Sequence, residues 1–194
     1  MKPHGLTAQY LTIAIALRIQ LCEYFERAAL IDKKSGMEGN EELEARRLTI
    51  VLLTAALCES CINAALALSL EPPEFRKIER KPPLEKWFVH SKRVNAAFTL
   101  DPKSADGQEL EFLIKCRNST THAQPEVYSE TATIHPGNHE PWSFLSHERI
   151  LSIVTLPITL LDQLCAGTEP FIATMPSSVA WQLHLIEFQT KPAT

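Results

Sequence analysis

An apolar run spanning residues 48–70 is the feature that most limits how this chain can fold. Its only formally charged side chain is Glu59, close to its middle. A run of this length can cross a bilayer, which takes about 20 residues, but a central carboxylate is costly in lipid. We therefore predict the buried central helix of a soluble, all-α bundle that contacts no membrane. A membrane-attached helical protein is the alternative.

Composition agrees with one helical domain. The chain has 194 residues, of which 45% are hydrophobic and 22% charged, so it can form a substantial core. Gly is scarce, and Leu and Ala occur in long runs that favour helices. We predict a helical domain over 1–170, followed by a C-terminal extension, 171–194, that either belongs to it or is frayed. The net charge of −4 means that any nucleic-acid contact must come from a local basic patch.

Periodicity and turn residues divide the chain further. The predicted helices cover 6–31, 41–70, 84–98, 107–122 and 146–166, with a kink at Pro157. Residues 71–83 are predicted as a connector because Pro pairs flank them. Residues 123–142 are expected to be irregular, with a short strand at 131–134, and 178–189 as a short helix or strand.

The first predicted helix has one apolar face and one charged face. The apolar face carries residues at helical spacing, which are Leu17, Leu21, Phe25 and Ala28. Glu23 and Arg27 are four residues apart, so we expect them to pair on another face.

The connector carries a small basic cluster of four residues: Arg76, Lys77, Arg80 and Lys81. One interpretation is that the cluster guides RNA toward a nearby site. The other is an ordinary solvated loop, because three glutamates in the same segment dilute its positive charge.

Metal-ligand residues occur in two places. His135, His139, Glu140, His147 and Glu148 lie close together, but prolines and a glycine make a metal-binding helix there improbable. The five cysteines are Cys22, Cys58, Cys61, Cys116 and Cys165. Most lie in apolar helical stretches, so we interpret them as reduced core residues of a cytosolic protein. We predict no metal and no cofactor.

The helix predicted at 107–122 ends in a polar edge. Its apolar stripe consists of Leu110, Leu113 and Ile114. Arg117 takes the next position on that stripe, where a charge needs a partner, an interface or a ligand. Asn118 and His122 are four residues apart and share a face.

Glu59 and Asn63 are likewise four residues apart on one face of the long apolar helix. A carboxylate in such a helix requires a cation. We predict that Glu59 pairs with Arg117 or orients His122.

The pattern Arg-Asn-x-x-x-His at 117–122 resembles the motif of the HEPN family, in which Arg and His are separated by four to six residues. The segment ALCESCINAALAL, residues 56–68, also resembles that family, whose long second helix often carries Glu and Asn at the places of Glu59 and Asn63. The resemblance covers roughly 6–166 in helix order. It implies an antiparallel helical bundle with a long irregular loop before the last main helix.

The resemblance also implies a metal-independent endoribonuclease. Arg117 and His122 would be catalytic, Asn118 would position them, and Glu59 and Asn63 would support them. In active members the motifs of two subunits meet at a homodimer interface. The 2′-hydroxyl attacks the adjacent phosphate and leaves a 2′,3′-cyclic phosphate, so DNA cannot be a substrate.

The residue types suit this chemistry. A guanidinium grips phosphate oxygens with several donors and can stabilise transition-state charge. Imidazole, with an ordinary pKa of about 6.5, transfers protons near neutral pH.

The family also suggests a cytoplasmic role in defence or growth control, with an antitoxin or a regulatory protein as a further partner. Some HEPN toxins carry a modified Tyr two residues after the motif His, but Gln124 stands there in this chain, which weakens that assignment. The alternative function is a non-catalytic HEPN-like module that binds nucleotides, RNA or a protein.

Overall fold

The computed structural model describes residues 4–31, 37–121 and 145–183, and every regular element in these ranges is a helix. The all-α prediction is therefore confirmed. The elements in chain order are α1 (His4–Ile31), α2 (Met37–Ser69), α3 (Pro72–Ile78), α4 (Pro83–Phe88), the 3-10 helix η1 (His90–Arg93), α5 (Ala105–Thr121), α6 (His147–Cys165), α7 (Pro170–Ala173) and α8 (Met175–Leu183).

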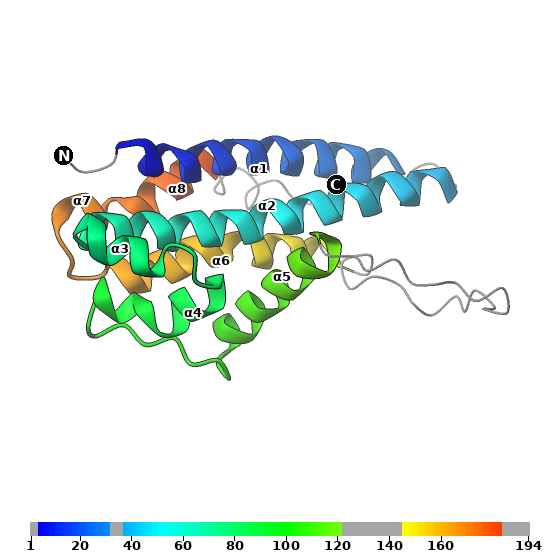
Figure 1. The fold of residues 1–194 in the computed structure, drawn as a ribbon. Coiled ribbons are helices and arrows are strands. Elements are labelled where there is room, and N and C mark those ends of the chain that lie inside the picture. Colours follow the sequence, from blue (N-terminus) through cyan, green and yellow to red (C-terminus); the bar gives the residue numbers. More distant parts are fainter. Residues whose placement is uncertain (1–3, 32–36, 122–144, 184–194) are drawn as a thin grey trace, which may run out of the picture.

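The long helices form a bundle around α2. Helices α1 and α2 lie antiparallel along most of their length, and α6 runs beside α2 (Figure 1). Helix α8 packs against both α1 and α6. The shorter α3 and α4 cover the C-terminal half of α2 (Figure 1).

Helix α2 is the core helix that its apolar run predicts. Ile50, Leu57, Ile62 and Leu66 have no exposed surface. Its segment Glu42–Ser69 is long and apolar enough to cross a membrane by composition, and 67% of its apolar window is buried inside the bundle. Burial on all sides explains why its hydrophobic residues show no single stripe.

The expected pair between Glu23 and Arg27 within α1 is wrong. Arg46 on α2 contacts Glu23 at 2.5 Å, and Arg27 contacts Glu42 on α2 at 2.6 Å. These charges lie where two antiparallel helices face each other, so partners on α2 replace the partner one turn away on α1.

The connector predicted at 71–83 contains a helix. Pro72 and Pro83 each occupy the first turn of a short helix, where proline is favoured because its missing N–H would have no partner. The Pro pairs thus start α3 and α4 as well as ending α2.

The helix predicted at 84–98 is too long. Helix α4 ends at Phe88, and η1 follows it. Beyond η1, the Asn95 side chain accepts from the Ala97 N–H and donates to the carbonyls of Leu164 and Ala166 at the end of α6. These bonds favour a turn at Asn95 and tie it to α6.

Helices α5 and α6 lie where the sequence predicts helices. The Ser104 hydroxyl accepts from the Gly107 N–H, and the Ser146 hydroxyl accepts from the Arg149 N–H, so serine caps the start of each helix. Helix α6 continues through Pro157, and Gly167 follows it with φ 71°.

Two further expectations concern irregular regions. The irregular segment predicted at 123–142, with its strand at 131–134, lies outside the described residues. The described part of 178–189 belongs to α8 and is helical.

The cysteine prediction is confirmed at four positions and wrong at one. Four free thiols are buried, in Cys58, Cys61, Cys116 and Cys165. Cys22 is exposed on α1 because it lies opposite the buried face of Leu17 and Leu21.

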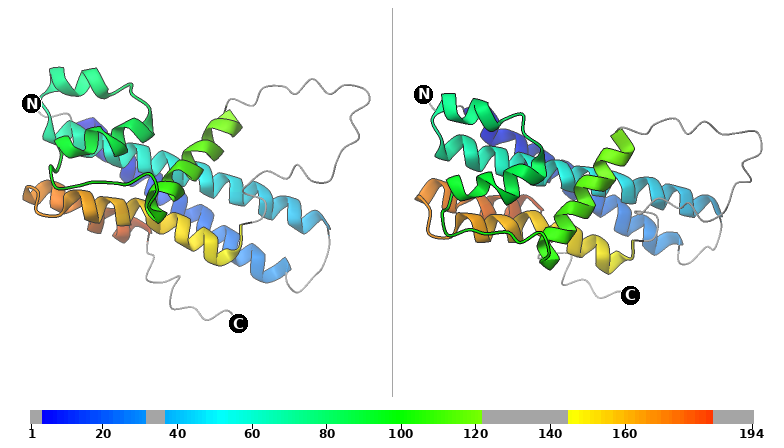
Figure 2. Two further views of the ribbon diagram at one scale, coloured as in Figure 1. Left: turned by 90° about the horizontal axis from the view of Figure 1, so that it is seen from below. Right: turned by 60° about the horizontal axis from the view of Figure 1, so that its bottom comes forward.

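Helix α5 is the element that positions the candidate site. It crosses the bundle obliquely rather than running along it (Figure 2). It packs against α2, α4 and α6. Its side chains therefore reach α2 on one side and α6 on the other.

Candidate functional site

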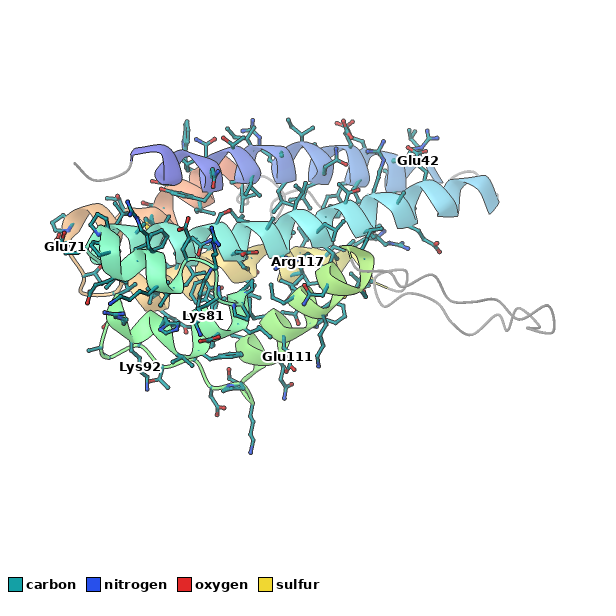
Figure 3. All side chains as sticks on the ribbon, in the orientation of Figure 1. Glu42, Glu71, Lys81, Lys92, Glu111 and Arg117 are labelled. Atoms are coloured by element: carbon teal, nitrogen blue, oxygen red, sulfur yellow. The ribbon has the colours of Figure 1, made fainter. Side chains whose placement is uncertain are left out.

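The predicted partnership between Glu59 and Arg117 is present. The Arg117 guanidinium donates from Nη2 to Glu59 Oε2 over 3.0 Å. The two side chains are 27% and 31% exposed, so the pair lies at the edge of the core. Figure 3 shows Arg117 at the end of α5 that approaches α2. Helices far apart in the chain thus bring these two charges together.

A second cation, Lys86 on α4, approaches the same carboxylate. Its Nζ lies 4.0 Å from Glu59 Oε1 and donates to the backbone carbonyl of Glu79 over 2.6 Å. The Lys86 side chain is 1% exposed. Burial lowers the pKa of Lys86, while Glu59 and Glu79 oppose that shift and Arg117 adds to it.

Nothing in the sequence pattern singles out Lys86. Lysine is almost never fully buried unless it is paired, and its partners come from α2 and from the end of α3. The neighbouring Trp87 is fully buried and donates from Nε1 to the Cys58 carbonyl over 3.2 Å. This bond fixes α4 on α2 next to Glu59 and so brings Lys86 to it.

Asn63 lies one turn after Glu59 on α2. Its Oδ1 is buried and has no hydrogen-bond partner among the described residues. A buried acceptor without a hydrogen bond is costly. Asn63 Oδ1 is therefore one of the few buried polar atoms that could still accept a hydrogen bond from a further group.

The remaining motif residues stand at the end of α5. Asn118 follows Arg117 and is exposed. His122 comes directly after Thr121, the last residue of α5, and lies outside the described residues. The structure therefore brings Glu59 and Arg117 together, adds Lys86, and does not place His122.

The four members of the basic cluster are exposed, on α3 and just after it. Lys81 pairs with Glu85 over 3.1 Å, and the nearby Arg93 pairs with Glu74 over 3.0 Å. Helix α4, which contacts α5, follows this cluster directly in the chain. The basic surface thus belongs to the same side of α2 as Lys86, and part of its charge is neutralised.

The alternative metal-binding sites are the histidine-rich segment and the two neighbouring cysteines of α2. Over the described ranges, no three His, Cys, Asp or Glu side chains are grouped to hold a metal ion. His135, His139 and Glu140 lie outside those ranges, while His147 and Glu148 are exposed on α6. Burial raises the pKa values of Cys58 and Cys61, so their thiols stay protonated and are poor metal ligands.

The cluster of Glu59, Lys86 and Arg117 carries two cations and one anion. The negative charge of Glu79 also acts on Lys86, so the charges around Arg117 are largely balanced. Such a cluster can hold a guanidinium in a fixed orientation, from which its remaining N–H donors could bind a phosphate. No protein-family model, no curated protein and no solved structure matches this chain.

Proposed function

We propose that this protein is a metal-independent endoribonuclease of the HEPN type, with Arg117 and His122 as its catalytic residues. The observation that supports this most is the Glu59–Arg117 ion pair at the end of α5, immediately before the rest of the motif. A motif arginine that is oriented by an acid from another helix is a prepared phosphate-binding group.

The proposed reaction is an internal transfer within the RNA chain. The 2′-oxygen attacks the adjacent phosphorus while His122 accepts the hydroxyl proton. The bond from phosphorus to the 5′-oxygen breaks, and that oxygen takes up a proton from the protonated His122 side chain of a second copy of the chain. The products are a 2′,3′-cyclic phosphate and a 5′-hydroxyl, and no metal or cofactor is needed.

Arg117 would stabilise the negative charge that grows on the phosphoryl oxygens. Glu59 and the buried Lys86 would orient Arg117 without touching the substrate, and Asn118 would position the phosphate or the imidazole. Asn63 would support Glu59 from the next turn. The basic cluster Arg76, Lys77, Arg80 and Lys81 would guide RNA toward the site.

The proposal includes a homodimer, because two copies of the motif complete one reaction centre. It places the protein in the cytoplasm, in defence or growth control. An antitoxin or a regulatory protein would restrain the activity.

A second function is favoured by a specific observation. Glu59 already neutralises Arg117 within the subunit, and Lys86 ties the same carboxylate to α4. Such a network can serve only to fasten α5 to the bundle. The chain would then be a helical module that binds RNA or a protein without turnover.

The experiment that separates the two functions is cleavage of a labelled RNA pool in EDTA. Wild type is compared with His122→Ala and with a matched histidine variant, His90→Ala, whose ring pairs with Glu85. The endoribonuclease predicts cutting by wild type and His90→Ala, with cyclic-phosphate ends, and none by His122→Ala. Equal cutting by all three, or none by any, would overturn the proposal.

A further inference from the structure

A cavity of about 340 Å³ lies between α5 and α6 and does not include the Glu59–Arg117 pair. Asp106, Glu109 and Phe112 line it from α5, and Arg149 and Leu156 from α6. Its volume is in the range of small-molecule sites.

Glu109 is the unusual residue of this cavity. It is 9% exposed, and its Oε2 accepts a hydrogen bond from Arg149 Nη2. Its Oε1 is buried and has no hydrogen-bond partner among the described residues. A buried carboxylate oxygen without a donor is costly. A ligand N–H group would remove this penalty if the Glu109 side chain turned Oε1 toward the cavity.

Arg149 supplies donors next to this acceptor. Its side chain is half exposed, and Glu109 is its one recorded side-chain partner in the described part of the chain. A guanidinium has five N–H donors, so it can hold Glu109 and a ligand carbonyl at the same time.

Asp106 supplies a second acceptor, one turn before Glu109. Residues at this spacing have Cβ atoms about 5–6 Å apart on a helix surface. Asp106 Oδ2 accepts from Gln163 over 3.2 Å, while Glu109 contacts Arg149. Because Arg149 and Gln163 stand at opposite ends of α6, the polar groups follow the order Arg149, Glu109, Asp106. The order of hydrogen-bonding character is therefore donor, acceptor, acceptor.

Two apolar side chains form part of the cavity wall, which is otherwise mostly polar and also includes Gln108, Ser152, Thr155 and Thr159. Leu156 is buried, and Phe112 packs partly buried against the core. An aromatic and an aliphatic side chain suit the faces of a flat ring, and base–aromatic stacking contributes about 1–3 kcal/mol per base.

We propose that this cavity binds guanine through its Watson–Crick edge. That edge presents an acceptor followed by two donors: the O6 carbonyl would face Arg149, the ring N1–H would face Glu109, and the exocyclic amino group would face Asp106. Cytosine presents a donor followed by two acceptors, which is the opposite character at each position. Adenine begins with a donor where Arg149 requires an acceptor, and uracil ends with an acceptor where Asp106 requires a donor.

The same edge is carried by a free guanine nucleotide and by a guanine in single-stranded RNA. Guanine binding does not depend on the ribonuclease activity. The idea that the cavity selects a guanine in RNA that is cut beside Arg117 rests on the proposed function. Glu109 and Arg117 are eight residues apart on α5, about 12 Å along the helix axis, so one RNA strand could reach both.

The test is calorimetric titration of wild type with GMP, IMP and AMP, none of which can be cleaved internally. IMP lacks only the exocyclic amino group. We expect saturable GMP binding, with IMP and AMP each weaker by about tenfold or more, the effect of a lost hydrogen bond to a charged group. Equal affinity for GMP and AMP, or no saturable GMP binding, would overturn the proposal whether or not the protein cuts RNA.

Two variants locate the binding. Glu109→Gln should weaken GMP binding about tenfold or more. Glu111→Gln is the matched control, because Glu111 lies on the same helix, pairs with Lys115 and does not line the cavity. GMP binding that survives Glu109→Gln would overturn the assignment, and the IMP comparison on wild type holds even if that variant folds poorly.

A final arm compares GMP with a short oligouridine that contains one guanine, using the His122→Ala protein so that no strand is cut. Tighter binding of this RNA than of GMP, lost when inosine replaces the guanine, identifies an RNA base as the ligand. Binding of GMP alone identifies a free nucleotide.

Discussion

Glu59 is the residue on which the candidate site depends. It is the one formal charge in the apolar run 48–70, and it receives Arg117 from α5 while Lys86 approaches from α4. A partly buried ion pair of this kind combines attraction with a desolvation penalty. The net effect of the pair on the free energy of unfolding is the difference between these two contributions.

A double-mutant cycle with Glu59→Gln and Arg117→Gln should give a coupling free energy of about 1 kcal/mol by urea denaturation. The reason is that both side chains are under one-third exposed. The matched pair Glu111–Lys115 is 41% and 72% exposed and should give less than about 0.5 kcal/mol. Equal coupling in the two cycles would contradict a special role for Glu59.

Glu109 predicts a pH dependence of stability. Burial raises its pKa from 4.5, Asp106 adds to the shift, and Arg149 opposes it. The folded state therefore binds the Glu109 proton more tightly than the unfolded state. The resulting stabilisation is complete below about pH 4.5 and is lost as the pH rises through the folded pKa.

The expected result is that wild type loses stability relative to Glu109→Gln between pH 4 and pH 7. Urea unfolding of both proteins at several pH values measures this difference. If the free energies of unfolding of the two proteins change in parallel with pH, or if wild type becomes the more stable as the pH rises, burial does not destabilise the ionised carboxyl group.

At the scale of elements, α5 starts against a fixed turn. A Cβ on Gly107 would lie 2.2 Å from the Asp101 backbone carbonyl oxygen. That turn is held by the Ser104 hydroxyl, which donates to the same carbonyl and accepts from the Gly107 N–H. Glycine is therefore required at this helical position by close approach, although alanine normally favours a helix.

Gly107→Ala should lower the free energy of unfolding by about 1–3 kcal/mol, the usual range for overpacking. Gly167→Ala is the comparison, because Gly167 has open space around it and only its φ of 71° opposes a side chain, at about 1 kcal/mol. Thermal unfolding of both variants measures this difference. A smaller loss of stability for Gly107→Ala than for Gly167→Ala would contradict the close contact.

At the scale of the whole molecule, the proposed activity requires two copies. The chain mass is 21.8 kDa. We expect a species of twice that mass by light scattering after size exclusion, in buffer without detergent, because α2 is buried within the bundle. A monomer at all concentrations would contradict the homodimer, and recovery only in detergent would favour the membrane-attached alternative.

The helix order was predictable because long apolar runs and turn residues mark where helices begin and end. The Glu59–Arg117 pair was predictable because each charge interrupts an apolar surface and needs a partner. The burial of Lys86 was not, because it depends on how Trp87 docks α4 on α2. The cavity between α5 and α6 was also hidden, since it arises from the oblique crossing of these two helices (Figure 2).

The most direct measurement is the single-turnover rate of RNA cleavage in EDTA by Arg117→Lys, with Arg93→Lys as the control. Lysine keeps the charge and loses the planar set of donors. Arg93 also pairs with a glutamate, but on the surface beside α3. If Arg117 stabilises the transition state, its variant should be slower by about 100-fold or more, with cyclic-phosphate products and unchanged cutting by Arg93→Lys. Equal rates for the two variants, or no cyclic phosphate from wild type, would contradict the proposed ribonuclease.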